Sequence, residues 1–265
     1  MLLTRIFTAL LLIAVIATTL VVGSAALFRG LVLLAVLFAL AEFYRLTLGA
    51  SRVYRLTATL LGLGLAACQS WHLPWERWLW AMALVLAVVL LWRATTLERF
   101  AARWGVALLG SIYIGSTLPY LSWLRALDHG RALVAMTLAM VALSDSAAFA
   151  VGRTLGRRKL APLTSPNKTL EGFIAGFAGS IVGMLGCRAL WWPEFPLLAA
   201  VQLGLVIGLV APIGDLIESA VKRGAHVKDS GQMLPGHGGM LDRCDAYLFS
   251  APIVYYFVTW LGISH

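Results

Sequence analysis

Charged residues are scarce in this sequence. Asp, Glu, Lys and Arg together make up 12% of the 265 residues, whereas hydrophobic residues make up 60%. An ordinary soluble domain has about 25% charged and about 45–50% apolar residues. A chain with so little charge cannot surround a globule with a solvated surface, so the composition argues against a water-soluble enzyme. The high apolar content also excludes a disordered chain.

Cysteine is scarce as well. The three cysteines, Cys68, Cys187 and Cys244, lie far apart in the sequence. A small disulfide-stabilised domain would need an even number of cysteines at short spacings, so that class is excluded. Cys/His pairs with the spacing of zinc ligands are absent too.

Long apolar runs fill most of the chain. A bilayer core requires about 20 apolar residues per helix, within a range of about 17–25. Candidate spans are residues 6–28, 31–44, 53–68, 78–92, 104–124, 133–151, 170–190, 197–217 and 247–261. We therefore predict an all-α polytopic membrane protein with about nine transmembrane helices. Small residues inside several spans, such as Gly62, Gly176 and Gly183, favour close contacts between helices.

The positive charges predict an orientation. With nine spans, 16 of the 21 Lys and Arg residues fall on the side that holds the N-terminus. Because cytoplasmic loops carry the excess of Lys and Arg, we expect the N-terminus inside and the C-terminus outside. The net charge of +9 fits cationic loops at anionic headgroups better than nucleic-acid binding.

Two polar segments divide the chain into regions. Residues 1–130 contain spans one to five, and residues 131–265 form a predicted catalytic region with cytoplasmic loops at 152–169 and 218–245. Asp145 lies inside the sixth span, and Asp215 and Glu218 lie at the end of the eighth. A carboxylate at bilayer depth is costly, so it normally faces a cavity, a cation or a partner. For the lone acid Glu42 we favour a helix-end carboxylate paired with a nearby Arg.

The segment 218–245 combines cations, carboxylates and glycines. Cations and glycine N–H groups bind phosphate oxygens, and carboxylates hold Mg²⁺, which bridges phosphates. The segment therefore predicts a site for a metal–polyphosphate. Its alternative is a solvated cytoplasmic turn.

The loop 152–169 supplies a second basic segment. Thr169 is placed to cap the following helix, with Glu171 in its first turn. Lys168 and Arg153 are candidates for binding a phosphate, whereas Arg157, Arg158 and Lys159 fit headgroup anchoring equally well. The spacing of a P-loop is absent.

Both segments resemble one enzyme family. The run Ser219-x-Val221-Lys222-Arg223, followed by Lys228-Asp229, Gly231, Leu234-Pro235, His237-Gly238-Gly239-Met240, Asp242-Arg243 and Asp245, resembles the signature of phosphatidate cytidylyltransferases (CDP-diacylglycerol synthases). Cys244 stands where that family has an aliphatic residue, Phe or Thr. The SPNKT-x-EG run at 165–172 is similar to the second block of that family.

The resemblance implies a function and a set of site residues. The reaction would transfer CMP from CTP to phosphatidate, giving CDP-diacylglycerol and pyrophosphate, with Mg²⁺ and a possible second cation. It implies a homodimer in a bacterial inner membrane, embedded among membrane lipids, with the active site facing the cytoplasm. The expected catalytic residues are Asp215, Asp242, Asp245 and Lys222, and the three aspartates are the expected metal ligands. The expected substrate-binding residues are Lys168, Arg153, Ser165, Arg223, Lys228, Asp229, His237, Gly238, Gly239 and Arg243.

Two other functions fit parts of the pattern. A CTP-dependent polyprenol kinase would also combine membrane helices with a nucleotide loop. A secondary transporter would place carboxylates within the membrane, but it predicts inverted repeats and broken helices near the midplane. Here the acids gather at one face of the membrane.

Overall fold

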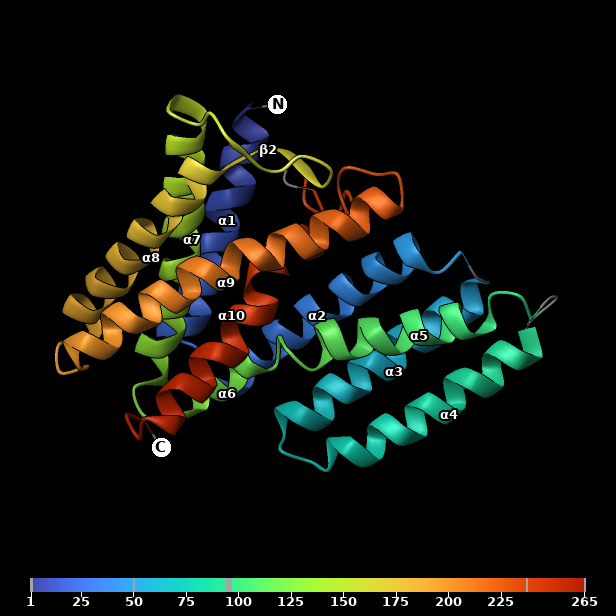
Figure 1. Ribbon diagram of the computed structural model, residues 1–265. Coiled ribbons are helices and arrows are strands. Elements are labelled where there is room, and N and C mark those ends of the chain that lie inside the picture. The colour runs from blue at the N-terminus through green and yellow to red at the C-terminus, as the bar shows by residue number, and fades with distance from the viewer. Residues whose placement is uncertain (1, 50, 94–96, 237, 265) are drawn as a thin grey trace. The chain divides into compact units, whose positions relative to one another are not determined.

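The computed structural model describes residues 2–49, 51–93, 97–236 and 238–264 (Figure 1). The chain forms two compact units. The first unit comprises Met1–Ser122 with Ala225–Cys244, and the second comprises Trp123–Gly224 with Asp245–His265. The boundary predicted at residue 130 separates regions by function, whereas these units are defined by packing. The functional division therefore stays a prediction.

The first unit is built from helices that bury aromatic and aliphatic side chains against one another. Its helices are α1 (Leu2–Val21), α2 (Ala25–Thr47), α3 (Arg52–Ser70), α4 (Trp75–Arg93), α5 (Phe100–Gly110) and the π-helical turn η1 (Ser111–Gly115). Helix α3 packs against α2, α4 and η1. The fully buried Phe43, Tyr44 and Tyr54 lie in the core of this unit.

The chain breaks earlier after the first helix than the hydropathy indicated. Helix α1 ends at Val21, and Ser24 caps α2 by accepting a hydrogen bond of 3.2 Å from the Leu27 backbone N–H. Phe28 therefore lies in α2, and the predicted break at residues 29–30 is wrong. The apolar run continues through the break, so hydropathy alone cannot locate it, whereas the serine cap satisfies helix N–H groups.

The predicted fifth span is interrupted in the structure. Helix α5 passes into η1, and α6 (Tyr120–Ala126) begins after Pro119. The Tyr44 hydroxyl donates to the Ala107 carbonyl at 2.6 Å and lies 2.7 Å from Ser111 Oγ. These buried contacts join α2 to α5 and to the π-helical turn.

The second unit consists of long helices and one small hairpin. Its elements are α7 (Gly130–Thr154), β1 (Lys159–Ala161), β2 (Ser165–Thr169), α8 (Leu170–Trp191), α9 (Leu197–Gly224) and most of α10 (Leu241–Trp260). Helix α8 packs against both α7 and α9 (Figure 1). At Gly172 and Gly183 an added Cβ would lie 2.6 Å from α7 carbonyl oxygens. The expected close packing at glycines is thus confirmed.

The predicted loops are shorter and more ordered than expected. Residues 152–154 belong to α7, and strands β1 and β2 pair as an antiparallel hairpin that the sequence analysis did not predict. Helix α9 runs through Pro212 to Gly224, so Glu218, Lys222 and Arg223 are helical. The connecting segment in the structure is residues 225–240, which we call the signature loop. The predicted loop bounds of 152–169 and 218–245 are wrong at both places, because the polar residues continue the helices.

The helices have the length and composition of membrane spans. Among the described residues, six helical segments qualify, namely α2, α4, Phe100–Ala126, α7, α8 and α9. Large apolar side chains such as Trp80, Leu84 and Ile174 are exposed on them, as expected for a surface in contact with lipid. The chain is an integral membrane protein. Helices α1, α3 and α10 overlap the other three predicted spans.

Candidate active site

Three carboxylates meet in the second unit. Asp215 and Glu218 lie one turn apart on α9, and Asp245 lies on α10. One oxygen from each can be chosen so that all three atoms lie within 4.8 Å of one another. Glu218 is fully buried. Because like charges at this spacing repel and are poorly solvated, the cluster favours a cation.

Two lysines lie against these carboxylates. Lys168 Nζ is 2.6 Å from Asp215 Oδ2, and Lys222 forms an ion pair with Glu218 one helical turn away. Ser219 Oγ also donates to Asp215 Oδ1 at 3.2 Å. The predicted site residues Asp215, Lys168 and Lys222 are therefore brought to one place, together with Asp245.

A close helix contact brings the two aspartates together. An added Cβ at Gly214 would lie 2.7 Å from the Asp245 carbonyl oxygen. Only a residue without a side chain lets the backbones of α9 and α10 approach this closely. The glycine before Asp215 thus contributes to the geometry of the acidic cluster.

Asp215 also lines a cavity of about 670 Å³ in the same unit. The polar residues lining it are Asp145, Arg153, Lys159, Asn167, Lys168, Thr169 and Asp215. Phe149, Phe173 and Leu160 add apolar surface. Cationic groups beside apolar walls suit an anionic headgroup attached to hydrocarbon chains.

The hairpin fixes the position of the cationic residues in this cavity. Thr169 caps α8 by accepting from the Gly172 N–H at 3.2 Å, which confirms the predicted cap. Glu171 accepts hydrogen bonds from the backbone N–H groups of Arg157 and Arg158 at 3.0 and 3.2 Å. Both bonds hold the connection before β1 against the start of α8.

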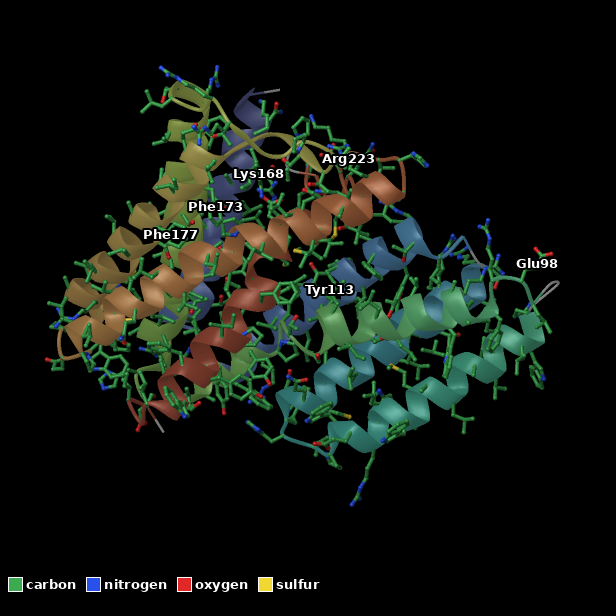
Figure 2. The ribbon with its side chains drawn as sticks, in the orientation of Figure 1. Glu98, Tyr113, Lys168, Phe173, Phe177 and Arg223 are labelled. Carbon is green, nitrogen blue, oxygen red and sulfur yellow. The ribbon has the colours of Figure 1, made fainter. Side chains whose placement is uncertain are left out.

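Helix α9 contacts the same hairpin at two places. Arg223 Nε donates to the Thr164 carbonyl oxygen at 3.3 Å, and Lys168 Nζ lies 3.4 Å from the Pro212 carbonyl oxygen (Figure 2). Ser165 starts β2 opposite Ala161. The phosphate contacts expected of Ser165 and Arg223 stay predictions.

The signature loop belongs to the first unit, where Asp242 organises it. Asp242 Oδ2 accepts hydrogen bonds from the Ser230 N–H at 2.9 Å and the Gly239 N–H at 2.7 Å, and it lies 2.9 Å from Ser230 Oγ. Gly238 has a φ of +82°, a conformation that favours glycine. Asp242 therefore joins two parts of the signature loop, at Ser230 and at Gly239, by hydrogen bonds. Its role as a metal ligand stays a prediction.

A second cavity, of about 740 Å³, lies along the signature loop. Predicted nucleotide-binding residues lining it are Lys228, Asp229, Gly238 and Arg243. Cations and backbone N–H groups around one cavity suit phosphate oxygens. The predicted binding residue His237 lies outside the described residues.

Two acidic residues that the structure places near these sites were not among the site residues predicted from the sequence. Glu218 joins the acidic cluster, and its spacing of three residues from Asp215 already placed both on one helical face. Glu42 lies beside the signature loop and the start of α10, where its Oε2 accepts a 2.9 Å hydrogen bond from the Leu241 N–H. A contact between residues 199 positions apart leaves no local signal in the sequence.

Comparison with known proteins identifies the family. A model of the cytidylyltransferase family matches residues 3–261, which is nearly the whole chain. The chain belongs to the cytidylyltransferase family. The resemblance of the two motif segments is thereby confirmed.

Three relatives named phosphatidate cytidylyltransferase are similar to this family member. The protein of Synechocystis sp. is 48% identical over 143 residues, which cover 53% of this chain and 48% of the relative. The protein of Bacillus subtilis is 40% identical over 153 residues, or 57% of each chain. A Staphylococcus aureus protein is 34% identical over 186 residues, covering 68% of this chain and 70% of the relative. The chain thus matches about half of the length of the first two relatives.

Proposed function

We propose that this protein transfers CMP from CTP to phosphatidate and releases pyrophosphate. The observation that carries the proposal is that Asp215 belongs to the acidic cluster and also lines the cavity that contains Arg153, Lys159 and Lys168, which we call the basic cavity. A carboxylate shared in this way suits a reaction in which a metal and an anionic lipid are used together. Family membership and the names of the relatives support the same activity.

The reaction needs little acid–base chemistry from the protein. A phosphate oxygen of phosphatidate, which is already anionic at neutral pH, attacks the α-phosphorus of CTP. The bond from that phosphorus to the oxygen bridging to the β-phosphate breaks, and pyrophosphate leaves with its electron pair. Catalysis then depends on positioning and on neutralising the charge of the phosphates. A Ser-His-Asp arrangement is not required for this reaction.

The acidic cluster fits a divalent cation. Mg²⁺ binds oxygen ligands at about 2.0–2.1 Å, so ligand atoms on opposite sides of one ion are about 4 Å apart. Oxygens of Asp215, Glu218 and Asp245 lie within 4.8 Å of one another, which is compatible after a small adjustment. When bound there, Mg²⁺ would neutralise charge on the nucleotide phosphates. We extend the proposed ligand set by Glu218, keep Asp242 as a predicted ligand, and leave a second cation as a further proposal.

The residues of each cavity have proposed tasks of their own. In the second unit, Lys168 and Arg153 hold the phosphate of the lipid, and the exposed ring of Phe149 contacts its hydrocarbon region. In the first unit, Lys228 and Arg243 hold phosphates of CTP with the N–H groups of the signature loop. Lys222 and Arg223 are proposed contacts of the CTP phosphates, as the sequence indicated.

The remaining proposals concern the cellular setting. Nine spans are proposed from the apolar runs, a cytoplasmic N-terminus from the distribution of the 21 Lys and Arg residues, and a bacterial inner membrane from the resemblance to the family. A homodimer follows from the resemblance to the family.

An assay with purified protein tests the proposed activity. The protein in detergent micelles is incubated with CTP labelled at the α-phosphate, phosphatidate and Mg²⁺, and both products are followed. We expect labelled CDP-diacylglycerol and an equal amount of unlabelled pyrophosphate. Phosphorylation of a polyprenol by γ-labelled CTP, without pyrophosphate release, would instead assign a kinase. Solute flux in proteoliposomes without CTP would assign a transporter.

A further inference from the structure

The carboxylate of Glu42 is enclosed by the signature loop. Glu42 lies near the C-terminal end of α2 and is only 7% exposed. Its Oε2 accepts hydrogen bonds from the Ser230 hydroxyl at 3.0 Å and from the Leu241 N–H at 2.9 Å. One turn later on α2, Arg45 donates to the Ser230 carbonyl oxygen at 3.0 Å. Helix α2 therefore contacts the loop through two polar side chains of opposite charge.

Two glycines of the loop leave room for this carboxylate. An added Cβ at Gly231 would overlap Glu42 Oε1, and one at Gly239 would overlap Glu42 Oε2 and Ser230 Oγ. Neither glycine has a positive φ. Space occupied by Glu42, rather than backbone conformation, is therefore the reason for a glycine at residue 231.

The Glu42 contacts lead directly to the phosphate-binding residues. Ser230 Oγ, which donates to Glu42, also lies 2.9 Å from Asp242 Oδ2, and Asp242 accepts from the Gly239 N–H. Gly231 and Gly238 line the loop cavity together with the cations Lys228 and Arg243. The position of Ser230 thus links Glu42 to the conformation of the cavity wall.

A carboxylate at residue 42 costs free energy within a membrane span, and an apolar side chain would pack there without this cost. Helix α2 qualifies as a membrane span, and Glu42 is the one acid among its 23 residues, beside the cations Arg29 and Arg45. A charged group within such a helix is expensive unless a specific partner compensates. The compensation here comes from hydrogen bonds of the signature loop. This indicates that Glu42 stabilises the conformation of the loop and does not stabilise the helix itself.

We infer that Glu42 is a positioning residue, which holds the signature loop in the conformation that binds nucleotide phosphates. The inference rests on the proposed function for the identity of the ligand. It assigns a task in nucleotide binding to the N-terminal helices, in which the sequence had placed no site residue. Glu42 itself does not touch the substrate in this proposal.

The experiment combines amide exchange with CTP binding on the full-length protein in detergent. Glu42→Ala is compared with the wild type and with Glu98→Ala, a matched change at an exposed acid (Figure 2). Loss of hydrogen bonds to a carboxylate should speed exchange of the Leu241 amide by about 10- to 100-fold and raise the Kd for CTP by a similar factor. The KM for phosphatidate should stay unchanged, and Glu98→Ala should match the wild type in all three measurements.

A steric rescue separates positioning from general destabilisation. Gly231→Ala alone should weaken CTP binding, because the new methyl group overlaps the Glu42 carboxylate. In the Glu42→Ala background the same change should cost little further affinity, since the space is then open. This comparison needs only binding data, and Glu42→Ser, which also leaves the space open, replaces Glu42→Ala if the alanine variant does not fold.

Three results would overturn the inference. They are unchanged Leu241 exchange in Glu42→Ala, faster exchange with an unchanged Kd for CTP, and losses from Gly231→Ala and Glu42→Ala that simply multiply. Failure of the proposed function looks different. In that case CTP binds and responds to Glu42 as described, but phosphatidate is not converted.

Discussion

Lys168 Nζ lies 2.6 Å from Asp215 Oδ2, so the β-hairpin and helix α9 are joined by an ion pair at the edge of the acidic cluster. The side chains of the pair are 25% and 32% exposed, which leaves both within reach of a ligand. A lysine in this position holds the carboxylate in place and also presents a positive charge to the basic cavity. The hairpin therefore contacts the acidic cluster through Lys168.

Loss of the Lys168 ammonium should reduce turnover. We expect Lys168→Met to lower kcat/KM for phosphatidate by about 10- to 100-fold, because a charge-assisted hydrogen bond contributes about 1.5–3 kcal/mol. Arg158→Gln in the same loop is the control. Its exposed side chain should contribute only headgroup attraction of about 1 kcal/mol, or about fivefold. Equal effects of the two changes would contradict a phosphate-binding role for Lys168.

A methyl group at residue 214 should separate α9 from α10. The added Cβ would lie 2.7 Å from the Asp245 carbonyl oxygen, and overpacking of this kind costs about 1–3 kcal/mol. Gly214→Ala should therefore lower both the melting temperature and the activity. Gly186→Ala, where an added Cβ meets nothing within 4 Å, should leave both unchanged or raise the melting temperature slightly. Native behaviour of Gly214→Ala would show that the close contact is dispensable.

Asp215 and Asp245 should act as a unit on one metal ion. Each change to Asn keeps the shape and removes one charge, so each should cut activity by about 100-fold or more at low Mg²⁺. The double variant should be little worse than either single variant, because both act through the same ion. Mg²⁺ binding measured by calorimetry should weaken in parallel, and Asp128→Asn serves as the control. Losses that multiply would mean that the two carboxylates work independently.

The predicted orientation can be tested by labelling single cysteines in a cysteine-free background. Gln232 in the signature loop and Glu194 between α8 and α9 are both exposed, whereas Ser230 and Ser264 are buried and unsuited to labelling. In intact cells, an impermeant thiol reagent should label Glu194→Cys but not Gln232→Cys. After the cells are opened, both should react. Labelling of Gln232→Cys from outside would reverse the predicted topology and separate the loop from cytosolic CTP.

The sequence predicted those features that depend on local pattern. Apolar runs located a helix for each predicted span, and Thr169 was recognised as a cap because capping depends on a few neighbouring residues. Asp215 was noticed as a costly acid at the end of the eighth span, and Asp245 was found through the motif. The hairpin 159–169 was missed, since SPNKT lacks the alternation of a typical strand and its pairing depends on tertiary contacts.

Long-range contacts explain the remaining errors. The sequence favoured a nearby Arg as the partner of Glu42, but the structure shows hydrogen bonds from the distant residues Ser230 and Leu241. Glu218 was noticed as a costly acid, yet its place in the cluster depends on Asp245 from another helix. Such partners are determined by packing between helices, which spacing along the chain does not encode.

The bond between Glu42 and Leu241 has a consequence for biosynthesis. Leu241 follows Glu42 by 199 residues, so a ribosome that adds about 5–20 residues per second needs about 10–40 s to supply the partner. During that interval α2 carries a carboxylate without the loop that later encloses it. The hydrogen bonds from Ser230 and Leu241 that compensate this charge form only when the last helix is made. Assembly of the nucleotide loop is consequently among the final events in the maturation of this protein.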